Sequence, residues 1–219
     1  MPENALPLSR VAYLTIYDAA RQYQKINGWA DLSMFCGVLE TAFRKRDRLY
    51  SETKGVMSDQ EVVKKNNALA FAATAIRIGA AHFQRKQEQG CEGVCVFTGG
   101  DKLEMAVSEA YNAGCMILAF VHAATVVESF TVLEEVISAP SDISRNNKNL
   151  ALYQKISSEH ENSLSNMVAV FSACREKKLP LDVDDILLSA KEVMGIKLGE
   201  GVSQAIRSMS VAKPYSPAP

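Results

Sequence analysis

Histidine and cysteine are the residue types in this chain best suited to a catalytic or metal-binding site, and both are scarce. None of the three histidines is part of His-Glu-x-x-His or Glu-x-x-His, the patterns that put metal ligands one helical turn apart. His122 lies in an apolar helical stretch, where a buried imidazole could act as a base or a ligand. Because most buried histidines only satisfy a hydrogen bond, a small-molecule or catalytic pocket around His122 is an alternative hypothesis and not the leading one.

The cysteines do not form a recognisable site either. Their odd number of five, scattered through apolar runs, indicates reduced thiols in a core. Cys91 and Cys95 are four residues apart, whereas zinc knuckles and redox pairs use Cys-x-x-Cys. A dyad of Cys115 with His122 would have to reach across two turns of one helix, about 10 Å. We therefore predict no catalytic and no metal-binding residue.

A glycine-rich segment, Thr98-Gly99-Gly100-Asp101-Lys102, precedes a predicted helix, where a phosphate-binding loop would lie. It lacks the glycine spacing of the P-loop and of the dinucleotide fingerprint, so it is interpreted as a tight turn. No nucleophile elbow or kinase motif set is present. The sequence therefore predicts no cofactor, and it favours a non-enzymatic protein without excluding an enzyme.

One basic cluster, made of Arg44, Lys45, Arg46 and Arg48, closes a predicted helix. Positive charge in a last turn suits the helix dipole, and such a cluster could also contact phosphates or an acidic partner. The formal net charge is −1, with 24 basic and 25 acidic side chains, which argues against a nucleic-acid module. A nucleic-acid-contacting regulator that uses Arg44–Arg48 is the second alternative, with nucleic acid an unlikely partner.

The apolar residues recur at helical spacing along most of the chain. This periodicity predicts a mainly α protein, a multi-helix bundle of about eight helices with one short strand pair as an option. The candidate strands are Val94–Phe97 and Gly195–Gly199. We expect a single domain over residues 1–211, an internal linker at 140–149 and a disordered Pro-rich tail at 212–219. The expected helices run from Ser9 to Asn27, from an Asp31 N-cap to Gly55, from a Ser58–Glu61 capping box to Gly90, from Asp101 to Ser138, over Leu150–Ser157, Ser163–Lys178 and Val183–Met194, and over Val202–Val211.

The centre of this bundle is predicted to be the helix that follows Ser58 and the one over Gly114–Ser138. Small residues crowd the first of them between Ala68 and Ala81, so a neighbouring helix can approach closely. The stretch Ala110–Val127 has no charged residue, and its length is marginal for a membrane span. Polar residues inside it and the absence of flanking basic or aromatic belts favour a buried core helix.

Without a constellation that carries chemistry, the leading hypothesis is a non-enzymatic protein-binding adaptor, a chaperone-like protein or a complex-assembly subunit. Arg44–Arg48 and Tyr215 in the Pro-rich tail are the candidate partner-binding residues. A protein partner is expected, and a homo-oligomer is compatible with the sequence. The start of the chain has no signal-peptide pattern, which predicts a cytoplasmic protein without an integral membrane segment. In general character the chain resembles small cytosolic adaptors of bacterial secretion systems, although no motif carries this resemblance.

Overall fold

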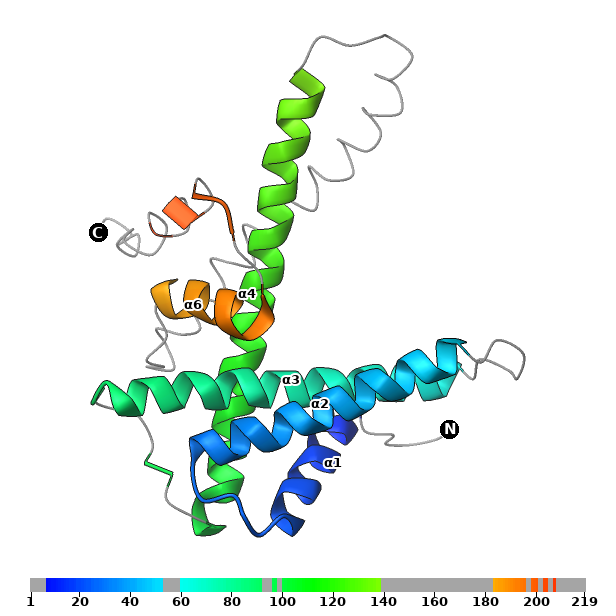
Figure 1. Cartoon of the computed structure of the whole chain (residues 1–219), viewed down its shortest axis with the longest axis vertical. Coiled ribbons are helices and arrows are strands. Elements are labelled where there is room, and N and C mark those ends of the chain that lie inside the picture. The colour runs from blue at the N-terminus through cyan, green and yellow to red at the C-terminus, as the bar shows by residue number, and fades with distance from the viewer. Residues whose placement is uncertain are drawn as a thin grey trace, which may run out of the picture. The chain divides into compact units, whose positions relative to one another are not determined.

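The described part of the chain is mainly α-helical, as predicted (Figure 1). The computed structural model describes residues 7–52, 60–91, 96–97, 100–138, 183–195, 198–200, 203–204 and 207. Its helices are α1 (Leu8–Gln22), α2 (Trp29–Glu52), α3 (Gln60–Glu88), the 3-10 turn η1 (Gly100–Lys102), α4 (Leu103–Ser138) and α6 (Val183–Met194). No strand occurs among these residues, and the candidate strands Val94–Phe97 and Gly195–Gly199 lie partly outside them. The count of eight helices is not confirmed, since the two expected between residues 150 and 178 lie outside the described ranges.

The chain forms two compact units, residues 1–115 and 116–219, and each is described by itself. The first unit holds α1, α2, α3 and the beginning of α4, and it contains the hydrophobic core described below. The second unit holds the rest of α4 and α6, where Ile117, Phe120 and Ile186 are fully buried. The predicted linker at 140–149 and the tail at 212–219 lie outside the described residues, so the predicted domain organisation stays a prediction.

The first two helices begin earlier than their predicted N-caps. Pro7, whose side chain makes no capping hydrogen bond, precedes α1, so the predicted Ser9 N-cap is wrong and Ser9 lies inside the first turn. A proline at a helix entrance fixes φ close to the helical value and has no N–H to satisfy. Asp31 lies in the first turn of α2, and its Oδ2 accepts a hydrogen bond from the Asn27 N–H at 3.0 Å. Asp31 therefore fixes the loop before α2 and does not cap the helix itself.

Helix α3 ends at a glycine, as predicted. Gly90 has φ of +69°, a conformation that glycine adopts at little cost. The Cys91 N–H donates to the Lys86 carbonyl at 3.0 Å, and the Gly90 N–H donates to the Gln87 carbonyl at 3.1 Å. This pair of hydrogen bonds is the Schellman motif, which satisfies carbonyls that the helix end would leave without partners.

Helix α3 is the centre of the first unit. Its residues 72–76 and 78–80 are all buried, which means that the helix is covered on every side over two turns. Helices α1 and α2 both pack on it, and Figure 1 shows α2 running along α3. Trp29, fully buried at the start of α2, lies 4.9 Å from the ring of Phe83 on α3 and 5.3 Å from that of Phe97. These rings join α2, α3 and the segment before α4 into one core.

Helices α3 and α4 touch backbone to backbone where they cross. A Cβ atom built on Gly79 would lie 2.8 Å from the Cα atom of Ala110, and one built on Gly114 would lie 2.9 Å from that of Ala75. Each helix thus contributes an alanine and a glycine four residues apart, and each glycine faces the alanine of the other helix. The predicted close approach at the small residues of α3 is confirmed, because only glycine leaves room for the opposing main chain.

Helix α4 continues without interruption through Gly114 to Ser138, two residues before Pro140. Within the described ranges, none of the helices has the length and apolar character needed to cross a membrane.

Candidate partner-binding surface

Helix α2 carries apolar side chains on two faces. Leu32 and Cys36 on its inner face are fully buried against the core. On the outer face, Met34 and Val38 are 64% and 65% exposed, the largest values among the large hydrophobic residues that the structure describes. Ala42, one further turn along, is exposed as well. A second apolar stripe therefore runs along α2, where none of the described residues of the first unit buries Met34 or Val38.

An ion-paired carboxylate fixes the rotation of α2 on α3. Glu40, 9% exposed, accepts hydrogen bonds from Nε of Arg77 on α3 at 2.7 Å and from Nε of Arg44 on α2 at 2.9 Å. One turn before Gly37, the Ser33 hydroxyl donates to the Arg77 carbonyl at 3.1 Å. The stem of Arg77 crosses α2 at Gly37, where an added Cβ would meet its Cδ at 3.2 Å. With these contacts made, α2 cannot turn its outer stripe inward.

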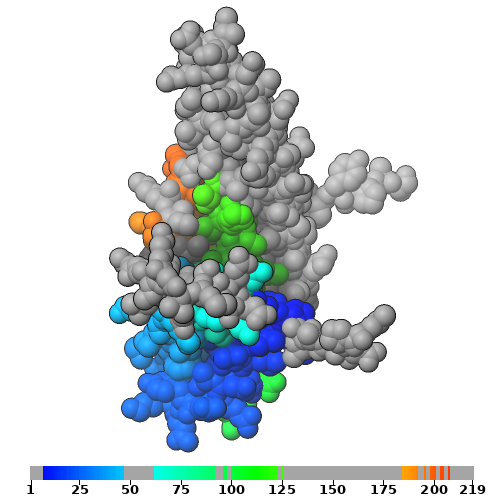
Figure 2. All heavy atoms as spheres, turned by 90° about the vertical axis from the view of Figure 1, so that its right-hand side faces the viewer, coloured from blue at the N-terminus to red at the C-terminus, as the bar shows by residue number. Residues whose placement is uncertain are grey.

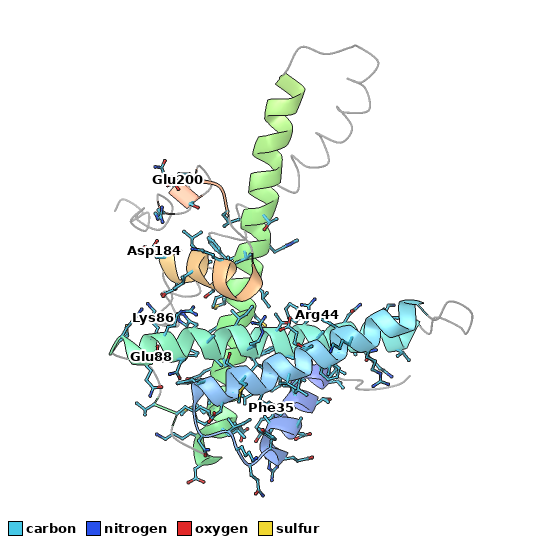
Figure 3. The ribbon with its side chains drawn as sticks, in the orientation of Figure 1. Phe35, Arg44, Lys86, Glu88, Asp184 and Glu200 are labelled. Atoms are coloured by element: carbon cyan, nitrogen blue, oxygen red, sulfur yellow. The ribbon has the colours of Figure 1, made fainter. Side chains whose placement is uncertain are left out.

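The charge on Glu40 is maintained by its two arginines. Burial raises the pKa of this carboxyl, but the hydrogen bond and positive charge of Arg77, together with the charge of Arg44, lower the pKa below its ordinary value. Glu40 is therefore ionised at neutral pH, and it holds α2 and α3 together as a charged group. Figure 3 labels Arg44 where α2 runs along α3.

A shallow, open hollow follows the outer face of α2. Its lining consists of Met34, Gly37, Val38, Thr41, Ala42 and Lys45. All six residues belong to α2, so the side of this helix forms the floor of the hollow. Figure 2 shows the atoms of α1 and α2, in shades of blue, at the surface of the first unit.

The hollow is apolar along its length and basic at one end. Lys45 is exposed and belongs to the lining, and Arg46 beside it is exposed too. The Arg44 side chain is 65% exposed even though its Nε is bound to Glu40. Residues 44–48 read Arg-Lys-Arg-Asp-Arg, a local excess of positive charge. The surface can therefore take an apolar group and a carboxylate side by side.

Three of the predicted site residues lie within one turn of α2. Arg44, Lys45 and Arg46 are all exposed there, and Lys45 is one of the residues that line the hollow. Arg48 belongs to α2, but its side chain lies outside the described residues, as does Tyr215. His122 lies on α4 with an exposed side chain, where the apolar stretch suggested a buried one, and the pocket around it stays a prediction.

Sequence reasoning missed Met34 and Val38. The available signal was the four-residue spacing of Ala30, Met34, Val38 and Ala42, which gives α2 a second apolar line beside the buried one. A search for one stripe in each helix assigns only the face that enters the core.

Two of the thiols in the first unit, those of Cys36 and Cys115, are poorly suited to a reactive centre. Burial raises the pKa of the Cys36 thiol to about 12, and burial also raises the pKa of the Cys115 thiol, which has a hydrogen bond with Tyr111. A thiol in that state does not supply the thiolate that a nucleophile or a metal ligand needs. Among the described residues, no group of three or more histidine, cysteine, aspartate and glutamate side chains gathers in a way that could hold a metal ion.

Comparisons of the chain with family models, with curated proteins and with solved structures found no match. Its function is therefore argued from the surface of α2. That surface combines exposed apolar side chains, a hollow and a basic end on a helix whose orientation is fixed.

Proposed function

We propose that the protein is a non-enzymatic binding protein, an adaptor or complex-assembly subunit, that holds a partner protein on the outer face of α2. The exposure of Met34 and Val38, one turn apart beside a hollow, is the observation that carries this proposal. Single exposed apolar residues are ordinary on protein surfaces. A line of them on one helix face, next to a recess, is the usual form of a site that receives a partner.

The rigidity of α2 supports the same function. Trp29 anchors the beginning of the helix in the core, and the Glu40–Arg77 ion pair fixes its middle. A surface that is already ordered loses little conformational entropy when a partner binds, so more of the contact energy contributes to affinity.

The apolar stripe is large enough to matter energetically. Complete burial of an exposed valine or methionine side chain contributes about 1.5–3 kcal/mol. Since Met34 and Val38 are each about two-thirds exposed, their burial contributes roughly 1–2 kcal/mol apiece. Together they would change the dissociation constant by about a hundredfold, at 1.4 kcal/mol for each factor of ten.

The test is affinity capture from the native host with the tagged wild type and with the double variant M34E/V38E. A control is Met105→Glu, which places one of the two added charges at an exposed methionine on α4. We expect a stoichiometric partner with the wild type and with the control, and its loss with the double variant. Circular dichroism and light scattering establish that all three proteins fold alike. A partner that binds the double variant as well as the wild type would contradict the proposal, and so would the absence of any partner.

A further inference from the structure

We infer that the segment of the partner seated on α2 is an amphipathic α-helix with an apolar stripe and clustered carboxylates. This inference rests on the proposed function and names the chemistry of what is bound. It follows from three properties of the hollow: its hydrogen-bonding capacity, its dimensions and its charge.

The floor of the hollow offers no main-chain hydrogen bonds to a ligand. It is the side of an α-helix, in which the N–H and C=O groups bond to one another along the helix axis. The Thr41 hydroxyl, which lines the hollow, already donates to the Gly37 carbonyl at 2.9 Å. An extended peptide laid there would leave its own backbone groups without partners as they lose water. A helix satisfies its backbone internally, so it is the form of chain that this floor accepts.

The dimensions of the hollow suit the side of one helix. Residues 34 to 42 cover about two turns of α2, or roughly 12 Å at 1.5 Å per residue. Among the lining residues, Gly37, Thr41 and Ala42 are small, whereas Met34 and Val38 have longer apolar side chains. Apolar side chains spaced three and four residues apart on a bound helix would fall between them.

The charge at the end of the hollow selects carboxylates. Lys45 borders the apolar floor, and it takes part in none of the ion pairs found in the described part of the chain. Its stem can cover apolar surface while the ammonium group stays in water. The exposed part of Arg44 adds to this positive end, since Glu40 engages only one edge of its guanidinium. A bound helix with glutamates or aspartates beyond its apolar stripe complements both features, and a basic helix is repelled.

The experiment uses the full-length protein and two synthetic fluorescent peptides of roughly five helical turns, about 18 residues. Both carry leucines at helical spacing along one face. One has glutamates at both ends of the stripe, and its twin has lysines at the same positions. Binding is measured by fluorescence anisotropy at low salt and again after salt is added.

We expect the wild type to bind the glutamate peptide at least tenfold more tightly than the lysine peptide, with a smaller ratio at high salt. Val38→Glu should weaken the glutamate peptide at least tenfold. Lys45→Glu should remove or invert the preference between the two peptides. Lys64→Glu makes the same charge change at an exposed position on α3, and it should leave the preference as in the wild type.

Equal binding of the two peptides, or binding of neither, overturns the inference. An equal effect of Lys45→Glu and Lys64→Glu also overturns it, because the attraction would then be a general effect of charge. Light scattering that shows a dimer dissociated by Val38→Glu would assign the surface to a second copy of this chain. Binding of anionic lipid vesicles or of duplex DNA that depends on both Val38 and Lys45 would assign it to a membrane or to nucleic acid. If a host protein is captured only when Met34 and Val38 are intact, and neither peptide binds, then the inference of an acidic amphipathic helix is wrong and the proposed function stands.

Discussion

Gly79→Ala adds one methyl group to α3 at its crossing with α4, where no room exists. The new Cβ would lie 2.8 Å from the Cα of Ala110 and closer still to the carbonyl oxygen of that residue. Because carbon atoms pack at about 3.5–4.0 Å, the two helices would have to separate by roughly 1 Å. Main-chain atoms inside a helix cannot move aside as a side-chain end can, so the whole crossing has to shift.

The expected cost follows from two opposing effects. Overpacking of a core costs typically 1–3 kcal/mol and occasionally more, and a backbone contact belongs at the upper end. Replacement of glycine by alanine inside a helix stabilises by about 1 kcal/mol. We expect Gly79→Ala to lower the free energy of unfolding by about 2–3 kcal/mol. Gly114→Ala should cost a similar amount, and the double variant less than the sum, since one separation accommodates both methyl groups.

The assay is urea unfolding followed by the fluorescence of the single tryptophan. Trp29 is fully buried in the first unit, so its emission reports on the unit that contains the crossing. Gly100→Ala is the matched control, because an added Cβ meets nothing within 4 Å there, and its stability should stay within about 0.5 kcal/mol of the wild type. A Gly79→Ala protein that is as stable as the wild type, or more stable as helix propensity alone predicts, would refute the described crossing.

Three further predictions concern the core of the first unit. Glu40→Gln should lower the free energy of unfolding at neutral pH by about 1–2 kcal/mol, because a charged acceptor for Arg77 becomes a neutral one. Since the pKa of Glu40 is lowered in the folded state, the difference in stability between wild type and variant is present above the ordinary glutamate pKa of about 4.3, and it should shrink as the pH falls through the folded-state pKa. Urea titrations of both proteins at pH 7 and at pH 3 measure this difference. An equal difference at both pH values would contradict an ionised Glu40 in the folded protein. Cys36 is buried and its thiol pKa is raised to about 12, so it should resist alkylation at pH 8 in the folded protein, whereas the partly exposed Cys91 should react. Peptide mapping should show both cysteines modified in urea. Rapid alkylation of Cys36 in the folded protein would contradict its burial. Phe97→Ala should lower the free energy of unfolding by about 3 kcal/mol and shift the tryptophan emission to longer wavelength, because the Phe97 ring is 2% exposed and packs on the indole of Trp29. An unchanged emission spectrum would contradict this contact.

Helix boundaries could be predicted where a local sequence signal alone determines the boundary. The predicted bounds of α6, Val183–Met194, agree with the structure, and α4 ends at Ser138, just before Pro140. The beginnings of α1 and α2 were misassigned because a proline and a loop contact replaced the usual side-chain cap at Ser9 and Asp31. Such contacts depend on the path of the chain before the helix, and the preference of a residue type for the N-cap position does not describe that path.

The candidate surface was only half predictable. The basic residues of α2 are visible as a run of charge, so Arg44, Lys45 and Arg46 were identified. Met34 and Val38 were not, because their exposure depends on which of two apolar faces α3 covers. One contact that fixes this choice is the pairing of Glu40 with Arg77, which joins residues 37 positions apart in the chain.

The crossing of α3 and α4 also constrains how this sequence can change over evolution. Its four positions, Ala75, Gly79, Ala110 and Gly114, are restricted by volume and not by chemistry, because main chain meets main chain there. The surrounding aliphatic residues can be exchanged for one another as long as the core stays filled. Distant descendants of this chain should therefore retain two pairs of small residues, each with a spacing of four, after most other identities have been lost. That pattern would identify a relative even where overall sequence similarity no longer does.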